Sequence, residues 1–409
     1  MSPSTSTHPQ DPARNPWPAV MAAGLATFSV VTTEMLPVGL LTAIAPSLGI
    51  STGQAGLMLS LPALLAVVFA PLVVLMAGNM DRRRILAGLL ALLVLANAAS
   101  ALAPSWGWML AARVLLGLCI GGIWAVAGGL AARLVPAAAM GLATSIIFGG
   151  VAAASVLGVP MGALIGEGAG WRWAFGVMAV FSALVLGLHL WVMPTLPVRS
   201  AVGLRQFLTL RSNRALQAGL WLSLLLVAGH FMAFTFVRPL LLAVSGFDAQ
   251  WIAALLLAYG LAGIAGNFIA GLAAARRTTL TVAAIALGLL LVPLLWLAFG
   301  GSPTGGFVLL LFWGLAYGGV SVALMTWMMK AAPQAMEIAA ALYVGVFNTG
   351  IALGAWAGGQ VVDGWGLQAN LWLAAAWAAM ALLLSLGLAV TRHHSGSAAK
   401  SASPDQIAP

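Results

Sequence analysis

Three charged side chains lie inside long apolar stretches of the chain, namely Glu34, Arg113 and Arg238. A charge in the middle of a membrane costs about 2.5–3.5 kcal/mol on insertion scales, so each needs a functional or structural reason. Glu34 is the only acidic residue so deep in any stretch. A carboxyl in apolar surroundings can take up a proton and release it when moving helices change those surroundings. Glu34 is therefore a candidate proton-coupling site, and the alternative is a structural carboxylate that stays permanently paired.

Arg113 is the candidate partner of Glu34. At 1.5 Å per residue of helix, Glu34 lies about 12 Å from one end of its stretch and Arg113 about 8 Å from the matching end of its own. The two depths differ by less than one helical turn, so an ion pair is geometrically allowed. Arg113 is expected to take part in proton coupling, or else to be a buried residue that only fixes two helices against each other.

Further polar and aromatic residues are candidates for substrate binding. Arg238 precedes Pro239 near the end of its stretch, where its long side chain could enter a site or simply extend to the lipid headgroups. His230, about two helical turns deeper, is either a substrate contact or a hydrogen-bonded packing residue. The remaining candidates carry a ring or an amide that suits a planar polar molecule; they are Trp124, Phe148, Trp327, Tyr343 and Asn348. For a tryptophan near a helix end, the alternative is an interfacial anchor.

The sequence does not favour an enzyme. Of the five histidines, His8, His393 and His394 lie in the terminal segments, and no His/Asp/Glu cluster or nucleophile with an adjacent base is present. The single cysteine, Cys119, excludes an intrachain disulfide and a cysteine metal site, and is expected to be a packing residue. There is no GxxxxGK[ST] pattern for binding ATP. No cofactor and no metal are expected.

The composition determines the class of protein. Of 409 residues, 62% are hydrophobic and 6% are charged, against roughly a quarter charged in ordinary globular proteins. These values exclude a water-soluble fold and predict the lipid bilayer as the environment. The net charge of +9 could attract an anionic partner. The basic residues nevertheless fall in short gaps between apolar stretches and form no continuous patch, so nucleic acid is not an expected partner.

Apolar runs long enough to cross a bilayer core of about 30 Å occur twelve times. They lack the alternation of a lipid-facing strand, so they predict helices and not a barrel. The expected fold is an all-α membrane protein with 12 transmembrane helices, over residues 17–42, 53–77, 85–104, 108–132, 141–166, 171–193, 215–243, 250–273, 279–300, 305–329, 338–362 and 367–391.

The positions of Lys and Arg predict the orientation, because cytoplasmic loops are rich in them. With the N-terminus inside, 14 of the 17 Lys and Arg residues fall in inside segments, so both termini are expected in the cytoplasm. The predicted organisation is six-helix halves at 17–193 and 215–391, a cytoplasmic linker at 194–214, and disordered cytoplasmic tails at 1–16 and 392–409.

An internal repeat relates the two predicted halves. The segment GLCIGGIWAVAGGLAARLVP at 117–136 aligns without gaps on GLAYGGVSVALMTWMMKAAP at 314–333, at an offset of 197 residues. Gly49 and Gly246 keep the same offset. Parallel repeats related by an axis along the membrane normal are typical of one transporter architecture, in which the binding site lies near the middle of the membrane between the halves. The paired glycines within the aligned segments are expected to allow close helix packing.

Several motifs resemble the major facilitator superfamily, in particular its drug and metabolite proton antiporter branch. They are GNMDRRR at 78–84, RVLLGLCIGG at 113–122 and GVPMG at 158–162. Arg84 stands where the loop motif usually has Gly, and the last motif lacks the usual paired Gly. The stretches EMLP at 34–37, GEGAGWR at 166–172 and FVRPL at 236–240 are similar to those of the purine ribonucleoside efflux group within this branch.

The resemblance implies a monomeric secondary transporter in a bacterial inner membrane. It implies export of small polar metabolites, with purine ribonucleosides as the leading candidate, by proton antiport through alternating access. Proton-coupled drug or sugar efflux is the alternative. For the loop residues Asp81, Arg82 and Arg84, it implies that Asp81 helps to lock an outward-open state; without the resemblance, these charges would only set the topology.

Overall fold

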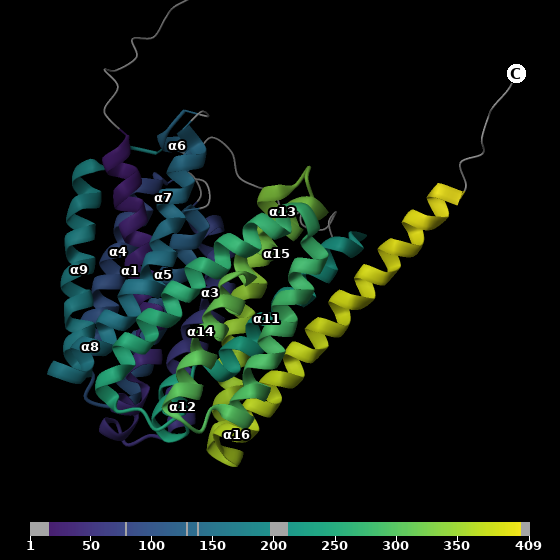
Figure 1. Ribbon diagram of the computed structural model, residues 1–409. Helices are drawn as coiled ribbons and strands as arrows, with labels where there is room; N and C mark the ends of the chain where they lie inside the picture. The colour runs from purple at the N-terminus through teal and green to yellow at the C-terminus, as the bar shows by residue number, and fades with distance from the viewer. Residues whose placement is uncertain (1–15, 78–79, 128–129, 137–138, 197–211, 402–409) are drawn as a thin grey trace, which may run out of the picture.

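The computed structural model describes residues 16–77, 80–127, 130–136, 139–196 and 212–401. Within these ranges the chain folds into helices and contains no strand (Figure 1). The first half comprises α1 (Trp17–Ser47), α2 (Thr52–Ala55), α3 (Leu57–Ala77), α4 (Arg82–Ala101), α5 (Trp106–Ala127), α6 (Ala131–Leu134), α7 (Met140–Ala153), the π-helix η2 (Ala154–Gly158), α8 (Val159–Ala169) and α9 (Trp171–Val192). The second half comprises α11 (Arg214–Phe234), α12 (Val237–Ala243), the short 3₁₀ helix η4 (Ala249–Trp251), α13 (Ile252–Phe299), α14 (Pro303–Gly318), α15 (Val320–Ala331) and α16 (Met336–Ser401).

Ten helical segments in the described ranges are long and apolar enough to cross a membrane. Two of them, Ala249–Phe299 and Ile338–Ala389, contain 51 and 52 residues, whereas one crossing needs about 20. Each is interrupted by one residue with non-helical backbone angles, Arg277 in the first and Gly366 in the second. Each segment therefore divides into two crossings, and the ten segments hold twelve. The predicted all-α membrane fold is confirmed.

Side-chain caps determine where several of the crossings begin. The side chains of Asp81, Asn213 and Ser302 each accept a hydrogen bond from a backbone N–H in the first turn of α4, α11 and α14. These caps satisfy N–H groups that have no partner within the helix. They fix the point at which the chain re-enters the apolar layer, within three residues of the predicted boundaries.

Four glycines reveal the repeat of the two halves in the backbone. Gly49, Gly170, Gly246 and Gly366 are the only described residues with positive φ, at 65°, 94°, 71° and 84°. Glycine adopts this left-handed region without the penalty that a Cβ imposes. Gly49 and Gly246 follow the first crossing of each half, and Gly170 and Gly366 follow the fifth. The halves therefore turn at equivalent places with equivalent residues.

The glycines of the aligned segments pack two equivalent helix pairs. A Cβ on Gly117 would lie 2.7 Å from the Cβ of Leu65, and one on Gly121 would lie 2.8 Å from a backbone nitrogen of α3. In the second half, a Cβ on Gly314 or Gly318 would lie 2.4 or 2.0 Å from carbonyl oxygens of α13. The fourth crossing thus packs on the second, and the tenth on the eighth, through small residues as the sequence predicts.

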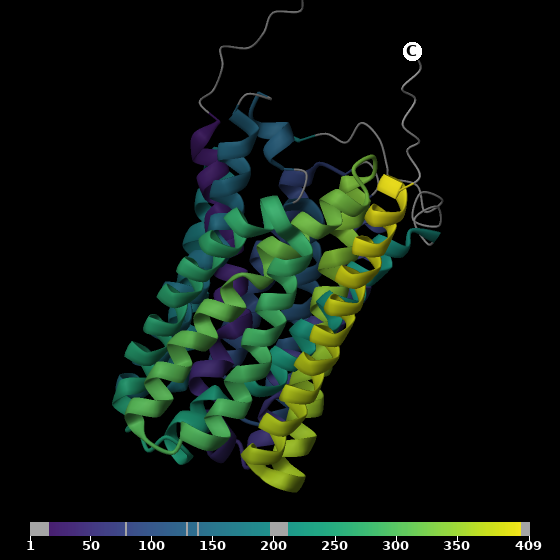
Figure 2. The same ribbon diagram turned by 45° about the vertical axis from the view of Figure 1, so that its right-hand side comes forward.

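The two ends of the bundle differ. Both described chain ends, at the start of α1 and the end of α16, lie at the upper end in Figures 1 and 2; we call this the terminal side. The opposite end, which carries Gly49, Gly170, Gly246 and Gly366, is the distal side. In Figure 1, the second half of α16 leans away from the first half of the molecule toward the terminal side.

The last helix differs from the expectation. α16 extends to Ser401, so it covers residues 392–401 of the segment predicted to be a disordered tail. No proline interrupts the chain before Pro404, and nothing else in this segment forces the helix to end. Residues 1–15, most of the predicted linker (197–211) and the last eight residues lie outside the described ranges.

Candidate functional site

Arg113 lies in a polar network inside the first half. Its side chain is fully buried. Its Nη2 atom donates to the hydroxyl of Ser100 at 2.7 Å and its Nη1 atom to the carbonyl oxygen of Thr33 at 3.3 Å. The guanidinium carbon lies 4.8 Å from the centre of the Phe175 ring, within the range of a cation–π contact. Arg113 therefore joins α5 to α4, α1 and α9.

The network continues through neutral groups of the same helices. The Asn97 amide donates to the hydroxyls of Thr33 and Ser182 at 3.0 and 3.3 Å. The hydroxyls of Ser29 and Ser182 lie 2.7 Å apart. These contacts satisfy buried polar groups that would otherwise be costly in the apolar layer. Hydroxyl and carbonyl oxygens, and not a carboxylate, thus surround the buried arginine.

Glu34 is buried but not paired with Arg113. Its side chain is 4% exposed, and no ion pair joins these two fully described residues. Arg113 instead binds the carbonyl of the preceding residue, Thr33. The Oε1 atom of Glu34 has no hydrogen-bond partner in the described part of the chain. The geometrically allowed ion pair with Arg113 is therefore not formed in this structure, and the proton-coupling role of Glu34 stays a prediction.

His230 lies in a column of stacked rings in the second half. Tyr317, His230, Phe234 and Tyr259 stack in this order, with ring centroids 3.3, 4.8 and 4.7 Å apart and interplanar angles of 9°, 22° and 27°. We call these four residues the ring column. They come from α14, α11 and α13. The stack places rings of three helices in direct contact, so the column holds these helices together.

Trp313 fixes the orientation of the histidine. Its Nε1 atom donates to Nδ1 of His230 at 3.1 Å, and its ring meets His230, Phe234 and Tyr259 nearly edge-on. Because Nδ1 accepts this bond, Nε2 of a neutral His230 carries the hydrogen. The Nε2 atom is buried and has no partner in the described residues. His230 is thus both a packing residue and an unused donor.

Two of the three tyrosines of the chain belong to the ring column. The sequence contains only Tyr259, Tyr317 and Tyr343. Tyr317 stacks on His230, and Tyr259 stacks on Phe234. Tyr343 is 5% exposed and its ring lies 5.7 Å from that of Phe347. The hydroxyl of Tyr259 is buried and has no hydrogen-bond partner among the described residues.

The other predicted substrate contacts lie elsewhere. Trp327 donates its ring N–H to the carbonyl of Ala215 at 2.8 Å, about 22 Å along α11 from His230 at 1.5 Å per residue. Trp124 of α5 and the partly exposed Phe148 of α7 pair with each other, their ring centroids 5.7 Å apart. The Asn348 amide donates to the carbonyl of Val344 in its own helix at 2.9 Å. Of the predicted set, only His230 belongs to the ring column.

The described hydrogen bonds of the loop residues 81–84 join parts of the first half to each other. The Asp81 carboxylate accepts hydrogen bonds from the backbone N–H groups of Arg83 and Leu196, each at 2.8 Å. The backbone N–H of Arg82 donates to the carbonyl of Leu196, and the Arg84 side chain is exposed. Asp81 thus caps α4 and holds the segment that follows α9.

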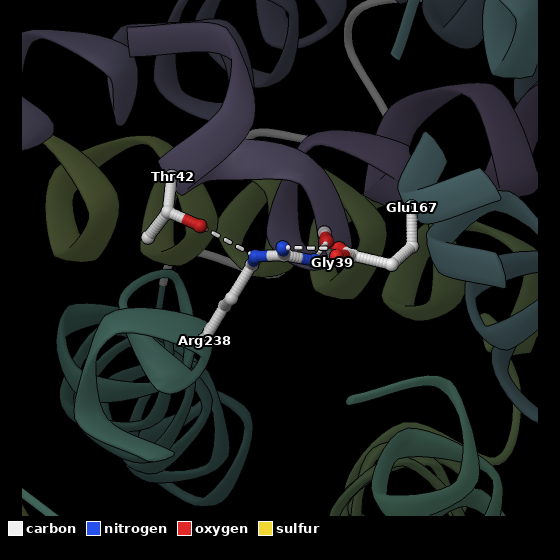
Figure 3. A network of polar contacts seen from close by, with 4 residues as sticks. All are labelled: Gly39, Thr42, Glu167 and Arg238. Atoms are coloured by element: carbon white, nitrogen blue, oxygen red, sulfur yellow. Dashed lines mark hydrogen bonds and ion pairs between the residues drawn. The ribbon is translucent and has the colours of Figure 1, made fainter. Parts of the chain in front are cut away.

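Arg238 joins the two halves near the distal side (Figure 3). Its side chain is 4% exposed, so it does not extend to the headgroups, and its Nη2 atom forms an ion pair with Glu167 of α8 at 2.9 Å. Its Nη1 atom donates to the carbonyl of Gly39 at 2.6 Å, and its Nε atom donates to the hydroxyl of Thr42. All three acceptors belong to the first half, whereas Arg238 belongs to α12.

The sequence interpretation missed several residues of both clusters. Tyr317, Tyr259 and Trp313 of the aromatic cluster and Glu167 of the distal network were not predicted as site residues. One available signal was the scarcity of tyrosine, which makes the presence of all three inside crossings informative. For Glu167, the signal was its place in the stretch GEGAGWR, where an acid stands next to an apolar crossing.

Comparison with known proteins identifies the family. The sequence model of the Major Facilitator Superfamily matches residues 23–344. The chain belongs to the Major Facilitator Superfamily. It is thus a membrane transporter of small molecules and not an enzyme. Two solved structures share the fold, each covering at least 90% of both chains: a bacterial homologue of the lysosomal transporter Spinster, with a TM-score of 0.75 at 16% identity, and a D-xylose–proton symporter, with 0.71 at 15%.

Relatives of the superfamily member described here include an efflux pump. The purine ribonucleoside efflux pump NepI of Salmonella paratyphi B is 33% identical over 362 residues, which cover 88% of this chain and 90% of the pump. The protein named transcription regulatory protein OpdE of Pseudomonas aeruginosa is 34% identical over 378 residues, which cover 90% and 93%. Both matches span the two halves, so the similarity is not confined to the general motifs of the superfamily.

Proposed function

We propose that this transporter exports small polar metabolites, with purine ribonucleosides as the leading substrate, by proton antiport. The observation that carries the proposal is the 33% identity to purine ribonucleoside efflux pumps over 88% of the chain. Proposed with it are a bacterial inner membrane location, a monomeric state and cytoplasmic termini. The terminal side then faces the cytoplasm and the distal side faces outward, which agrees with the arginines on the terminal side.

The environment of Glu34 supports its role as the proton carrier. The carboxyl is buried and has an oxygen without a partner in the described residues. Alternating access moves the halves against each other, so the surroundings of Glu34 change with each cycle. Such a change alters the balance between burial and polar contacts that determines whether a carboxyl binds a proton. Arg113 contributes by holding the backbone of α1 beside Glu34.

Proton entry supplies enough free energy for export. One proton contributes about 2.3 kcal/mol per 100 mV of membrane potential, and a tenfold concentration ratio of a neutral solute costs about 1.4 kcal/mol. One coupled proton can therefore hold a gradient of roughly fiftyfold for each 100 mV.

The aromatic cluster supports a planar, polar substrate. When the halves move apart during alternating access, a ring at the end of the column can stack on a flat heterocycle. The N–H of His230 and the hydroxyls of the tyrosines can bond to heteroatoms at the edge of a base or to a ribose. A nucleoside has both kinds of group. A carrier for lipophilic drugs has less use for unpartnered donors, which favours the nucleoside over the drug and leaves sugar efflux as the competing polar substrate.

Transport by the purified protein tests the proposal. Proteoliposomes with an imposed pH gradient are given labelled purine ribonucleosides, pyrimidine ribonucleosides, sugars and lipophilic drugs. We expect saturable, uncoupler-sensitive movement of the purine ribonucleosides above the others. A preference for drugs or sugars assigns the same fold to the alternative efflux function. Flux that uncouplers do not affect contradicts the proton coupling.

A further inference from the structure

We propose that Glu167, Arg238 and Asp363 form a two-armed latch that holds the distal side of the transporter shut. The first arm is the Arg238 network. The guanidinium binds the Glu167 carboxylate at 2.9 Å and the Gly39 carbonyl at 2.6 Å, and its Nε atom binds the Thr42 hydroxyl. One side chain of the second half thus has its donors bound to three groups on α1 and α8 of the first half (Figure 3).

The second arm is the Asp363 carboxylate. It lies at the distal end of the eleventh crossing in α16, and its Oδ1 atom accepts from the backbone N–H of Gly53 at 2.8 Å. Its Oδ2 atom accepts from the hydroxyl of Ser51. Both donors lie at the start of the second crossing in the first half. A carboxylate that binds two donors of the other half at once is a directional contact, which separation of the halves would break.

Close backbone packing lies directly beside the second arm. A Cβ on Gly53 would lie 2.1 Å from the carbonyl oxygen of Gly359, and one on Gly56 would lie 3.2 Å from the carbonyl oxygen of Ala355. Contacts of this kind require glycine on the approaching helix. The latch therefore closes on a seam where the two halves touch through their backbones.

Two described polar contacts at the terminal side join segments of the same half. Arg83 binds the carbonyl of Leu190, and the Lys330 ammonium binds carbonyls of α13 at 3.1 and 2.8 Å. Separation of the halves at the terminal side leaves both contacts intact. Opening of the distal side breaks the two arms of the latch. The latch therefore stabilises one of the two access states, and Arg238 acts on the conformational equilibrium.

The location of the two acids suits a latch that opens in every cycle. Glu167 is 39% exposed, beside a cavity of about 190 Å³ lined by Ala163, Leu164, Glu167, Gly168, Ala249, Gln250 and Ala253. The side chain of Asp363 is also exposed. Water can therefore solvate both carboxylates when the distal side opens. The buried Arg238 guanidinium gains access to water only with that opening, so it keeps the first arm closed until then.

A cysteine reporter measures the opening. Leu256 is 1% exposed on α13, with its Cδ1 atom packed toward Gly39 of the first half. The natural Cys119 is fully buried, so Leu256→Cys is the reactive thiol. The protein is placed in lipid nanodiscs, where a maleimide reaches both sides and the result is independent of orientation.

Two acid variants, Glu167→Ala and Asp363→Ala, are compared in the Leu256→Cys background with the parent and with Arg172→Ala. Arg172 is the matched control, because it binds the Ala103 carbonyl and the Trp171 ring within its own half.

The latch predicts faster labelling in both acid variants. Coupling between sites in proteins typically changes populations by roughly 5- to 150-fold, so we expect about a tenfold increase in rate for each variant. The double variant should label faster than either single variant, since the arms are separate and their effects add. Arg172→Ala should label like the parent.

Two outcomes would overturn the latch: acid variants that label at the parent rate, or a control that rises as much as they do. Because both truncated side chains are exposed, loss of folding is not expected, and a thermal unfolding scan of each variant checks this. As a second route, Gly53→Ala places a methyl in the seam and should also accelerate labelling. No substrate is present in these measurements, so their failure is distinct from failure of the proposed export function.

Discussion

Gly318→Ala should destabilise the second half, whereas Gly263→Ala, on the facing helix, should not. A Cβ on Gly318 would lie 2.0 Å from the carbonyl oxygen of Gly263 and 2.7 Å from its Cα atom, against 3.4 Å for an ordinary contact. The obstacle is backbone, so α14 must move away from α13 by more than 1 Å. A Cβ on Gly263 would lie 3.6 Å from the carbonyl oxygen of Gly314, which is an ordinary contact.

The magnitude follows from two opposing effects. Overpacking a tight interface costs about 1–3 kcal/mol, and a backbone obstacle belongs at the upper end of this range. Alanine is about 1 kcal/mol better than glycine in a helix, which offsets part of the cost. We expect Gly318→Ala to lose about 2 kcal/mol of the free energy of unfolding, and Gly263→Ala to lose none.

Size-exclusion chromatography of heated, detergent-solubilised protein measures the effect as the temperature at which the monodisperse peak is lost. Gly318→Ala should lose it at a lower temperature than the parent, and Gly263→Ala at the same or a higher one. Equal stability of the two variants would refute the backbone contact between the eighth and tenth crossings.

Two further predictions concern the proposed orientation and substrate. Reporter fusions at residues 80, 205 and 395 should read cytoplasmic and a fusion at 246 should read external, because arginines lie on the terminal side; a cytoplasmic signal at 246 would contradict the orientation. Overproduction of the protein should raise resistance of bacteria to toxic purine nucleosides more than to unrelated lipophilic drugs, as measured by growth inhibition, and the opposite ranking would favour drug efflux.

The arrangement of crossings could be predicted from the sequence because it depends on properties that are local. Apolar runs of sufficient length give the helices, as in α1, which begins at the predicted residue. Gly49 and Gly246 form equivalent turns with positive φ. Glycine favours this backbone conformation in any tertiary environment, so the turn can be read from the sequence. The glycines at 117 and 314 pack as predicted because the repeat places both on the same face of equivalent helices.

The partners of the buried charges could not be predicted in the same way. Depth along a helix allowed Glu34 to meet Arg113, but rotation about the helix axis decides which group a side chain meets. Arg113 binds the Thr33 carbonyl, an acceptor that every residue carries and that no residue type reveals. Arg238 meets Glu167 across the two halves, a contact that depends on which access state the transporter adopts.

The aromatic contacts could not be predicted from the sequence for the same reason. The sequence placed His230 and Tyr343 inside crossings, but only the tertiary arrangement brings Tyr317 and Tyr259 into one column with His230. Trp327 has an aromatic side chain of the type expected in a substrate site, yet its ring N–H donates a hydrogen bond to a backbone carbonyl near the start of α11. Residue type and depth therefore select candidates, and helix rotation and register decide among them.

The central claim is that Glu34 carries the coupling proton, and Glu34→Gln tests it most directly. The glutamine keeps the shape and most of the hydrogen bonding but cannot release a proton. Equal amounts of parent and variant are reconstituted, and two modes are measured: uphill export driven by a pH gradient, and substrate exchange without a gradient. We expect gradient-driven export by the variant to fall to background while exchange, which needs only the alternating motion, survives at least in part. Full gradient-driven export by Glu34→Gln would contradict the claim.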